Sequence, residues 1–558
     1  QRGVSALIYD QTCAAELRRK RKRGLIETPA QRVVINEMVC EGCGDCNRIS
    51  NCLSVVPVET EFGRKRAIDQ SSCNRDFSCL DGFCPSFVTL DGAEPKAPVP
   101  LDPDILPSPP EPAKPDLSSP YNVLIAGVGG TGVVTASGLI GLAAHLEGKA
   151  VMELDQTGLA QKFGAVLSHI RVAQRSEDLH GARIPAGQVD LLLGGDLLVA
   201  AGKEALISLA EDRSAVLVNT HEEMPPSFIN ERDLEFPGQA LLTALGRASR
   251  PDGFFALDAS RLARVLTGDG LSANVLLLGA ALQRGLLPVT AESLERALEL
   301  FGSNVEQNKR ALAWGRYAVL DPDKVGQLAG GLEPAQELSD SLDEIVSRRS
   351  AFLSQYQDSA YGQRYQRRVD RVRAAEAGVR PDSTELAEAV ARNYFKLLAY
   401  KDEYEVARLY TQTGFLEQLR SDYQGGLKLR FHFSPSLIAG IDPNSGRPKK
   451  YEFGSWILGV LRVLARFRFL RGTALDPFSY TKERRLERRL IADYEALLAG
   501  LCEELDEPHL ATAVELAGLP DQIRGYGPIK EAAAETVRAR WDELVDAWGG
   551  LRARLKAH

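Results

Sequence analysis

Seven of the nine cysteines in this 558-residue chain lie between Cys40 and Cys84. The other two, Cys13 and Cys502, are far from that window in the sequence. Secreted disulfide scaffolds are short chains with cysteines throughout, and this chain has neither property. The window therefore predicts a metal site with thiolate ligands in a reducing compartment, and we expect the protein to be cytoplasmic.

The first part of the window has the spacing of a cluster-binding run. Cys40, Cys43 and Cys46 are separated by two residues each, and Cys52 follows after five more. This run resembles that of bacterial ferredoxins, in which three cysteines bind one iron–sulfur cluster and the fourth binds a second cluster. The spacing therefore predicts two clusters rather than one.

The second part of the window resembles a ferredoxin run with one substitution. Asp76 stands between Cys73 and Cys79 at the position of the central cysteine, and Cys84 precedes Pro85. Ferredoxin topology then assigns the ligands to two sets, each expected to hold a 4Fe-4S cluster. The first set is Cys40, Cys43, Cys46 and Cys84; the second is Cys52, Cys73, Cys79 and, if a protein group completes it, Asp76.

Two hypotheses stay open for Asp76. A carboxylate is a harder ligand than a thiolate and holds iron less firmly, so that iron could be lost or its potential shifted. Either Asp76 ligates the second cluster, or it is a surface residue beside a 3Fe-4S cluster or a corner completed by water. Structural zinc and disulfides are rival interpretations of the whole window. Zinc favours pairs of cysteines two residues apart, and only the first run offers them.

The composition divides the chain into five segments. Ten of its 29 prolines lie between Pro95 and Pro120, which predicts an extended linker of polyproline type. Alternating strands and helices follow, and then a charged helical stretch with few strand signals. We predict a multidomain α/β protein: 1–35, the tail of an upstream domain with a strand at Val4–Tyr9; 36–92, a ferredoxin-like two-cluster module; 93–120, the linker; 121–335, a Rossmann-like parallel-sheet domain; 336–558, a helical C-terminal domain.

Particular strands and helices are expected within the two large segments. The α/β segment has apolar runs at Val123–Ala126, Val151–Leu154, Val166–Val172, Asp190–Leu193 and Ala215–Val218. The C-terminal segment has apolar residues at helical spacing in Glu385–Tyr400, Ser455–Arg468, Lys482–Glu504 and Lys530–Lys556.

A glycine-rich loop follows the first strand of the α/β segment. It reads Gly127-Val128-Gly129-Gly130-Thr131-Gly132, and a helix is expected from Val133. This is the G-x-G-x-x-G form in its strand–turn–helix context, where glycines let a phosphate approach the helix N-terminus. The candidate cofactor-binding residues are therefore Gly127, Gly129, Gly130, Thr131 and Gly132.

The ligand of this loop stays open. Glu153, at the end of the next strand, has the place of a ribose-binding acid, which favours a dinucleotide such as NAD(P)H. The segment Asp155–Gly158 is unlike an ordinary dinucleotide site. Another phosphate-bearing ligand and a purely structural turn are the alternatives.

The charge and hydropathy of the chain exclude two classes of partner. The formal net charge is −8, which argues against a nucleic-acid partner held by bulk positive charge. No apolar run approaches the roughly 20 residues that a membrane span needs. We expect neither nucleic-acid nor membrane binding.

Several segments resemble the indolepyruvate ferredoxin oxidoreductase family. In the cysteine window these are Val39–Cys46, Ser50–Cys52, Glu61–Arg66, Ser72–Cys79 and Gly82–Phe87. In the α/β segment they are Gly127–Thr135, Leu154–Lys162 and Ser168–Arg171. The resemblance spans the chain and is most specific over residues 36–90 and 121–175. Phe163 departs from the pattern, because a second glycine is usual there.

The resemblance implies a fold and an activity. Members resembling this chain have a thiamine-diphosphate half, a ferredoxin-like module, a gamma-type 2-oxoacid oxidoreductase domain and a helical C-terminal region, and this chain resembles the second half. An aryl pyruvate such as indolepyruvate would be decarboxylated on thiamine diphosphate and Mg²⁺ in the partner half. The clusters would carry the electrons to ferredoxin, and coenzyme A would take the acyl group as an arylacetyl-CoA. A homo- or hetero-oligomer is expected.

The thiamine-diphosphate motif itself is not expected here. Gly268-Asp269-Gly270 has its first letters, but it follows a helix-like segment, and no asparagine falls within 294–302 to complete the Mg²⁺ site. We predict a helix-linking turn, so this chain alone does not decarboxylate a substrate.

Two other functions remain as alternatives: an NAD(P)-linked iron–sulfur oxidoreductase subunit, and a non-catalytic electron-transfer or scaffold subunit. Two basic runs, Arg18–Arg23 and Arg64–Arg66, bear on the partner. Either could attract an acidic ferredoxin, and the first could clamp a coenzyme A phosphate. A solvated surface or a subunit contact is the alternative for both.

Overall fold

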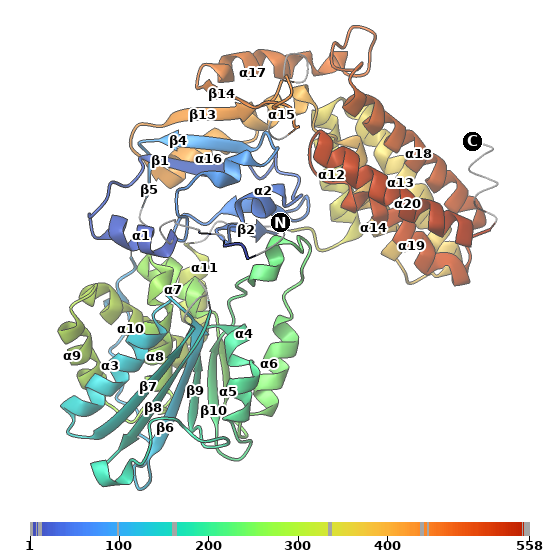
Figure 1. Cartoon of the computed structure of the whole chain (residues 1–558). Helices are drawn as coiled ribbons and strands as arrows, with labels where there is room; N and C mark the ends of the chain where they lie inside the picture. Colours follow the sequence, from blue (N-terminus) through green and yellow to red (C-terminus); the bar gives the residue numbers. More distant parts are fainter. Residues whose placement is uncertain are drawn as a thin grey trace. The chain divides into compact units, whose positions relative to one another are not determined.

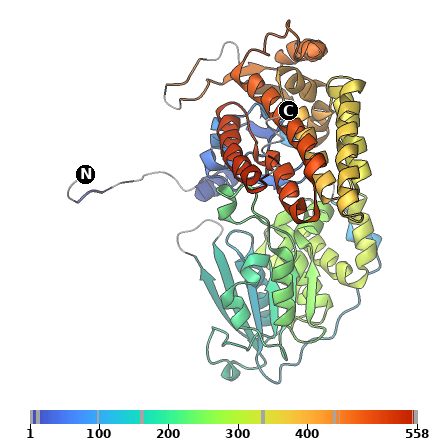
Figure 2. The ribbon, with the colours of Figure 1, turned by 90° about the vertical axis from the view of Figure 1, so that its right-hand side faces the viewer.

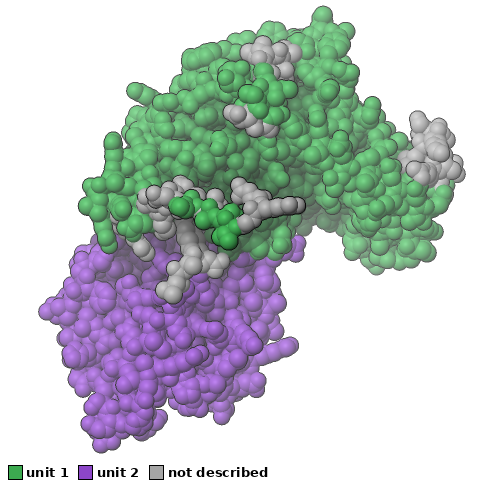
Figure 3. All heavy atoms as spheres, in the orientation of Figure 1, with its two compact units in different colours: residues 1–96, 226–234, 336–558 green, residues 97–225, 235–335 purple. Residues whose placement is uncertain are grey.

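The computed structural model describes residues 4–6, 8, 14–96, 100–158, 164–332, 338–435, 440–443, 446–549 and 551. The chain divides into two compact units, coloured separately in Figure 3. Unit 1 comprises residues 1–96, 226–234 and 336–558, and unit 2 comprises residues 97–225 and 235–335. The cysteine window and the C-terminal segment therefore belong to the same unit.

Unit 2 is built on a six-stranded sheet in the order β11-β10-β9-β6-β8-β7. Strands β6, β9, β10 and β11 are parallel, whereas β8 runs antiparallel to both β6 and β7. The first five strands in chain order lie where the sequence predicts them, and β11 was not anticipated. The bounds are β6 (Tyr121–Val128), β7 (Ala150–Thr157), β8 (Ala165–Ala173), β9 (Leu191–Gly194), β10 (Ala215–Asn219) and β11 (Phe254–Leu257).

Helices cover both faces of this sheet (Figure 1). Alternate residues of β6 explain why: Val123 and Ile125 enter one core, and Leu124 and Ala126 enter the other. One face carries α3 (Val133–Leu146), α8 (Ala273–Gln283), α9 (Ala291–Phe301) and α10 (Val305–Leu320); the other carries α4 (Leu197–Ala200), α5 (Lys203–Ile207) and α6 (Gly238–Arg247). Helices α7 (Ala259–Thr267) and α11 (Pro322–Gly330) complete the unit.

Helices α8 and α10 pack closely because glycines face each other's backbone. A Cβ on Gly279 would lie 2.0 Å from the carbonyl oxygen of Leu312, and one on Gly315 would lie 1.9 Å from that of Leu276. Any larger residue at either position would force the two helices apart.

The described part of the proline-rich segment runs along α10 of unit 2. The indole N–H of Trp314 donates to the carbonyl of Leu101 at 3.1 Å, and the hydroxyl of Tyr317 donates to that of Leu106 at 3.2 Å. The guanidinium of Arg316 donates to the carbonyls of Pro109 and Pro110. Proline-rich backbone has free carbonyls, so side-chain donors of the helix hold it in place.

Unit 1 contains a four-stranded sheet in the order β1-β4-β13-β14. Strand β4 pairs with β1 on one edge and with β13, more than 330 residues later in the chain, on the other. The bounds are β1 (Gln31–Ile35), β4 (Phe87–Asp91), β13 (Lys428–Phe433) and β14 (Tyr451–Gly454). Strands β13 and β14 were not predicted, and through them the C-terminal segment extends the sheet of the cysteine window.

Short elements complete this part of unit 1. A hairpin of β2 (Val55–Val58) and β3 (Lys65–Ile68) follows α2 (Asp45–Ser50), and β5 (Glu94–Pro95) pairs with β12 (Tyr423–Gln424). Helices α15 (Glu403–Thr411), α16 (Phe415–Asp422) and α17 (Ile457–Arg466) contribute to the core on the sheet, with Phe431 fully buried.

The rest of the C-terminal segment is a helical bundle, as the sequence predicts (Figures 1 and 2). Its core is formed largely by leucines and buried tyrosines such as Tyr365, Tyr394 and Tyr494. The helices are α12 (Leu342–Tyr356), α13 (Ser359–Val379), α14 (Glu385–Leu398), α18 (Lys482–Glu504), α19 (Leu510–Gly518) and α20 (Pro528–Ala547).

The strand predicted at Val4–Tyr9 is not formed at the residues that the structure describes there. Val4–Ala6 and Ile8 lie outside any strand, and the side chains of Val4 and Ile8 are exposed. Much of the basic run is helical, within α1 (Ala14–Lys22). Among the described residues, no helix is long and apolar enough to cross a membrane.

Candidate functional site

The eight predicted ligands come together in two sets. The thiol of Cys46 lies within electrostatic range of Cys40, Cys43 and Cys84. The thiol of Cys79 lies within electrostatic range of Cys52, Cys73 and Asp76. Each set has the members that ferredoxin topology assigns to one cluster. That these side chains bind clusters stays a prediction.

The first run folds around its sulfurs through two glycines. Gly42 and Gly44 have φ of 66° and 75°, in the left-handed region that favours glycine. The N–H of Gly42 donates to the sulfur of Cys40 at 3.3 Å. A Cβ on Gly42 would lie 2.2 Å from the carbonyl oxygen of Arg64, so only glycine fits there.

The second run repeats this backbone without glycine. Arg75 and Phe77 have φ of 53° and 64° at the positions equivalent to Gly42 and Gly44. The N–H of Arg75 donates to the sulfur of Cys73 at 3.4 Å, as that of Gly42 does to Cys40. A left-handed conformation costs a side-chain-bearing residue roughly 1–2 kcal/mol. Strain of this kind persists at sites where the surroundings enforce it.

Asp76 lies at the centre of this strained run and is exposed. Its Oδ1 accepts hydrogen bonds from the N–H and the hydroxyl of Ser78, at 3.2 and 3.0 Å. The same hydrogen-bond pattern would orient the carboxylate whether it ligates iron or faces solvent. The structure therefore leaves both hypotheses for Asp76 open.

The donor set fits iron–sulfur clusters. All eight described cysteines are free thiols. Burial, with smaller effects from neighbouring groups, raises the pKa of Cys43 to about 11 and that of Cys79 to about 12, and it raises the pKa values of Cys46 and Cys84 further. Buried thiols of this kind become thiolates when a metal supplies compensating positive charge. In the described part of the chain, no three His, Cys, Asp or Glu side chains form a group that could hold a single metal ion.

The C-terminal segment supplies cations and hydroxyls to the first set, and the sequence analysis missed them. The ammonium of Lys401 donates to the carbonyl of Cys40 at 3.0 Å and pairs with Glu41. That of Lys450 donates to the carbonyls of Leu80 and Gly82. The separation in sequence exceeds 350 residues for each, so no local pattern could have identified them.

Tyrosine hydroxyls and an arginine add further contacts. Tyr526 donates to the carbonyl of Val39 at 2.5 Å, and Tyr410 donates to that of Pro85 at 2.7 Å. The guanidinium of Arg447 pairs with Asp45, whose side chain is only 2% exposed. The backbone on both sides of the first set is thereby held by the C-terminal segment.

The run Arg64–Arg66 is not an exposed basic patch, which corrects the ferredoxin-docking hypothesis for it. Arg66 is 1% exposed, and its guanidinium donates to the side chain of Asn47 and to the carbonyl of Arg232. Lys65 is also buried. Residues 226–234 pack on Arg64 and Arg66 within unit 1.

Part of the run Arg18–Arg23 contacts the second set. Arg18 donates to the carbonyl of Ser72 at 3.3 Å, and Arg21 donates to that of Asn74. These carbonyls flank Cys73. Cys13 and Phe163 lie outside the described residues.

The glycine loop of unit 2 is closed by hydrogen bonds. The N–H of Gly129 donates to the carbonyl of Gly164 at 2.9 Å, and the hydroxyl of Thr131 donates to that of Val128 at 2.7 Å. The amide of Asn274 donates to the carbonyl of Thr131 at 2.9 Å. Gly130 and Gly132 have φ of 92° and 97°, so the loop needs glycine for its turn. The N–H of Gly129 is thus committed within the fold.

Glu153 does not lie where a ribose-binding acid would, which corrects that hypothesis. Strand β7 is separated from β6 by the antiparallel β8, whereas a dinucleotide site places the acid on the adjacent parallel strand. Glu153 of β7 pairs with Ile170 of β8, and Ile170 pairs with Val123 near the start of β6. Glu153 therefore lies away from the glycine loop, which follows the end of β6. Its carboxylate accepts a hydrogen bond from Ser137 of α3.

The two other family-like segments of unit 2 pair with each other. Asp155 of β7 is opposite Ser168 of β8, whose hydroxyl donates to its carboxylate at 2.5 Å. Next to this pair, the ring of His169 contacts the amide oxygen of Gln156 at 3.3 Å. Where the structure describes them, these residues form cross-strand contacts in the sheet.

The turn Gly268–Gly270 links helices, as predicted. Gly268 ends α7 with a φ of 81°, and Asp269 accepts a hydrogen bond from the N–H of Leu271. Its carboxylate caps the next turn.

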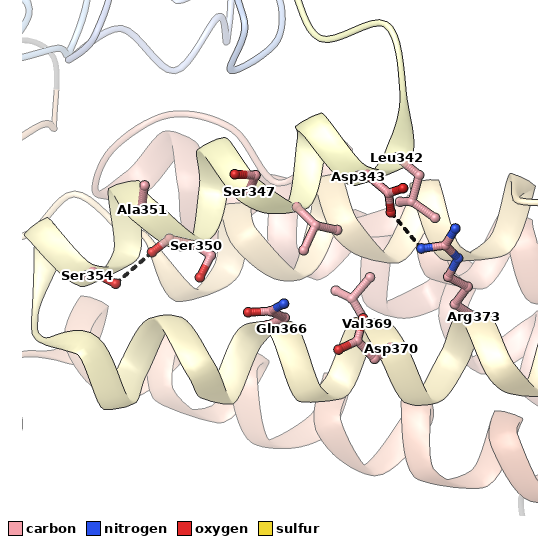
Figure 4. A pocket seen from close by; sticks show the side chains of 11 residues that line it. Leu342, Asp343, Ser347, Ser350, Ala351, Ser354, Gln366, Val369, Asp370 and Arg373 are labelled. Carbon is pink, nitrogen blue, oxygen red and sulfur yellow. Dashed lines mark hydrogen bonds and ion pairs between the residues drawn. The ribbon is translucent and has the colours of Figure 1, made fainter.

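A groove of about 460 Å³ lies between α12 and α13 (Figure 4). Small side chains of α12, including Ser347, Ser350 and Ser354, leave the space, and the ion pair of Asp343 with Arg373 lies at one end. None of the predicted ligands or loop residues lines it.

Two family models match the chain. The model described as pyruvate ferredoxin/flavodoxin oxidoreductase matches residues 122–318, within which the glycine loop lies. A family of unknown function, DUF6537, matches residues 342–543.

Curated relatives match about a third of the chain. Indolepyruvate oxidoreductase subunit IorB of Pyrococcus horikoshii is 30% identical over 32% of this chain and 85% of its own length. Its namesake in Methanothermobacter thermautotrophicus is 34% identical over 31% of this chain and 84% of its own length.

Parts of the chain are also similar to two solved structures. The pyruvate oxidoreductase subunit PORC of Thermotoga maritima is 22% identical, with a TM-score of 0.26 over 36% of this chain and 96% of its own. The 2-oxoglutarate:ferredoxin oxidoreductase of Magnetococcus marinus is 17% identical, with a TM-score of 0.27 over 43% of this chain and 38% of its own.

The curated relatives confirm the resemblance to the indolepyruvate oxidoreductases. Two of them are at least 30% identical, and the match covers more than four fifths of each. The chain therefore belongs to the indolepyruvate oxidoreductase subunit IorB family.

Proposed function

We propose that this chain is the electron-transfer half of a thiamine-diphosphate-dependent indolepyruvate, or aryl pyruvate, ferredoxin oxidoreductase. The observation that supports this most is the gathering of seven thiols and Asp76 into two sets with ferredoxin-like membership. Iron–sulfur clusters bound there would accept and release single electrons. The cysteines of this chain would hold the clusters.

Each set has a distinct place in the proposal. Cys40, Cys43, Cys46 and Cys84 would hold a 4Fe-4S cluster, and Cys52, Cys73 and Cys79 would hold the second. We propose that Asp76 is the fourth ligand of the second cluster. The backbone around Asp76 repeats that around Cys43, even though this places Arg75 and Phe77 in the unfavourable left-handed conformation. A 3Fe-4S cluster beside a free Asp76 is the alternative.

The remaining chemistry would belong to a partner half. Thiamine diphosphate and Mg²⁺ there would decarboxylate indolepyruvate, ferredoxin would take the electrons, and coenzyme A would take the acyl group as an arylacetyl-CoA. The helix-linking role of Gly268–Gly270 agrees with a partner that carries the thiamine motif. The loop Gly127–Gly132 stays a prediction for a phosphate-bearing ligand of this assembly.

The NAD(P)-linked alternative has weaker support. Glu153 faces α3 from a strand that is not adjacent to β6, so the ribose-binding carboxylate of a dinucleotide site lacks its counterpart at this residue. The non-catalytic electron-transfer or scaffold alternative fits the isolated chain equally well. Adding the partner half distinguishes that alternative from the main proposal.

Reconstitution tests the proposal. The anaerobically purified chain is combined with a thiamine-diphosphate half, indolepyruvate and coenzyme A, and ferredoxin reduction is followed by visible absorbance. We expect reduction that requires this chain and is lost in Cys40→Ala. Ferredoxin reduction at an equal rate without this chain, or reduction of NAD(P)⁺ in place of ferredoxin, would overturn it.

A further inference from the structure

The region of unknown function and the cysteine window share one sheet and one core. Strand β13 pairs with β4 from Lys428 opposite Asp91 to Phe431 opposite Val88. Val39 and Val88 from the window pack in the same core as Tyr410 and Tyr526. A region that completes the fold around a cofactor site is placed to act on that cofactor.

Lys450 is the cation that this region places between the two sets of thiols. It follows β13 in the segment that leads into β14, and its ammonium donates to the carbonyls of Leu80 and Gly82. These residues lie between Cys79 of the second set and Cys84 of the first. Lys450 is within electrostatic range of both thiols.

The loop that Lys450 holds lies against the first set itself. A Cβ on Gly82 would be 3.1 Å from the Cα of Cys46, so a side chain there would require the backbone to shift by a few tenths of an ångström. Lys450 also lies over the ring of Phe87, 5.8 Å from its centroid. Its side chain is thus fixed by carbonyls and a ring within the module.

Lys450 differs from its two neighbouring cations in its direct partners. Lys401 pairs with Glu41 at 2.5 Å, and Arg447 pairs with Asp45 at 2.9 Å. The hydrogen bonds described for Lys450 go to carbonyls, and no carboxylate pairs with it among the described residues. Of the three cations, Lys450 is the one without an ion-paired carboxylate, although Asp81 and Asp45 lie within electrostatic range of it.

We propose that Lys450, and through it the region matched by the family of unknown function, sets the reduction potential of the clusters. A cluster that takes up one electron gains one unit of negative charge, with no bond made or broken. A nearby ammonium in a partly buried site stabilises the reduced form more than the oxidised form. Lys450 is a positioning residue for electron transfer, and this role rests on the proposed function.

Redox titration followed by EPR tests the role in the full chain. Lys450→Met removes the charge, and Lys449→Met, an exposed neighbour near the ring of Tyr451, removes the same charge outside the site. At the wild-type midpoint potential we expect the ratio of reduced to oxidised cluster to fall about tenfold in Lys450→Met, equivalent to about 59 mV for one electron. Lys449→Met should stay within about twofold, and Lys450→Arg should retain most of the wild-type ratio.

Iron content separates the outcomes. Lys450→Met with full iron and a wild-type titration overturns the role of Lys450 and leaves the proposed function intact. If Lys450→Met loses iron, Lys450→Gln, which still donates to the carbonyls, is titrated instead; loss of iron from both assigns Lys450 to holding the loop and overturns the proposal. A wild-type chain without iron overturns the proposed function itself.

Discussion

Asp76 is the residue whose identity most affects the chemistry of the site. Its neighbours Arg75 and Phe77 adopt left-handed backbone that glycines adopt in the first run. The spacing predicted that Asp76 replaces a cysteine, but the sequence could not show that the whole backbone of the first run is repeated. The repeat also explains why a change at this one residue can be tested without remodelling the loop.

Asp76→Cys is expected to convert the second set into a four-thiolate site. Iron content should stay unchanged because Asp76 already holds the fourth iron, whereas the EPR signal of the second cluster should change to that of an ordinary 4Fe-4S centre. A gain of about one iron per chain would instead support the 3Fe-4S alternative. Asp81→Cys places a thiol at another exposed aspartate of the same segment and serves as the control. An Asp76→Cys protein with unchanged iron and an unchanged spectrum would show that Asp76 is a surface residue.

Glu147 is the carboxylate that joins α3 to α9 in unit 2. Burial opposes its ionisation, but hydrogen bonds from Lys149, Ser293 and Thr290 outweigh burial and lower its pKa to about 2. Its ordinary pKa is about 4.3, so the folded state gains stability above that pH and loses it as the pH falls from about 4 to about 2.

Glu147→Gln should therefore lower the unfolding free energy of unit 2 at pH 7 by about 1–3 kcal/mol and flatten its decline below pH 4. Thermal unfolding between pH 3 and pH 7 measures both. Glu299→Gln, at an exposed ion pair with Lys309, is the matched control. Equal pH dependence in Glu147→Gln and the wild type would contradict the assigned role.

At the scale of elements, the pairing of β4 with β13 joins the cysteine window to the C-terminal segment. Phe431 of β13 is 0% exposed, and its ring lies 5.3 Å from that of Tyr410 and 5.9 Å from that of Phe433. Of the helices on this sheet, the sequence predicted α17, because its apolar residues recur at helical spacing, but α15 and α16 were not predicted. The sequence did not lead to β13, although Lys428–Phe433 alternates polar and apolar residues as a half-buried strand does. What the sequence does not reveal is the partner strand, which lies more than 330 residues away.

Phe431→Ala should cost about 3–5 kcal/mol and loosen the sheet under the first set of thiols. We expect a lower midpoint of thermal unfolding and faster release of iron to a chelator. Phe467→Ala removes a ring that is 44% exposed and should leave both unchanged. Iron release at the wild-type rate in a destabilised Phe431→Ala protein would indicate that the sheet does not support the site.

For the whole molecule, the sequence predicted the kinds of segment better than their grouping. Five of the six strands of the main sheet in unit 2, and helices α14, α18 and α20 of the bundle, were predicted from periodicity. The grouping depended on contacts that composition does not reveal, such as Arg66 with residues 226–234 and Lys450 with the loop before Cys84. The helical C-terminal segment is consequently part of the cysteine unit rather than an independent attachment.

Removing residues 336–558 should therefore remove the cluster site as well. The edge of β4 and the core beneath it would be exposed, so we expect aggregation or a protein that does not retain iron. A chain ending at residue 551 keeps the whole described fold and is the control. A shortened chain of residues 1–335 with full iron content would show that the cysteine window folds independently.

The central claim is that this chain carries two iron–sulfur clusters for electron transfer. Iron and acid-labile sulfide analysis, with low-temperature EPR before and after dithionite, tests it most directly on anaerobically purified protein. We predict about seven or eight irons per chain and signals from two centres that change on reduction. Four irons or fewer would leave only one cluster, and zinc in place of iron would remove electron transfer from the account.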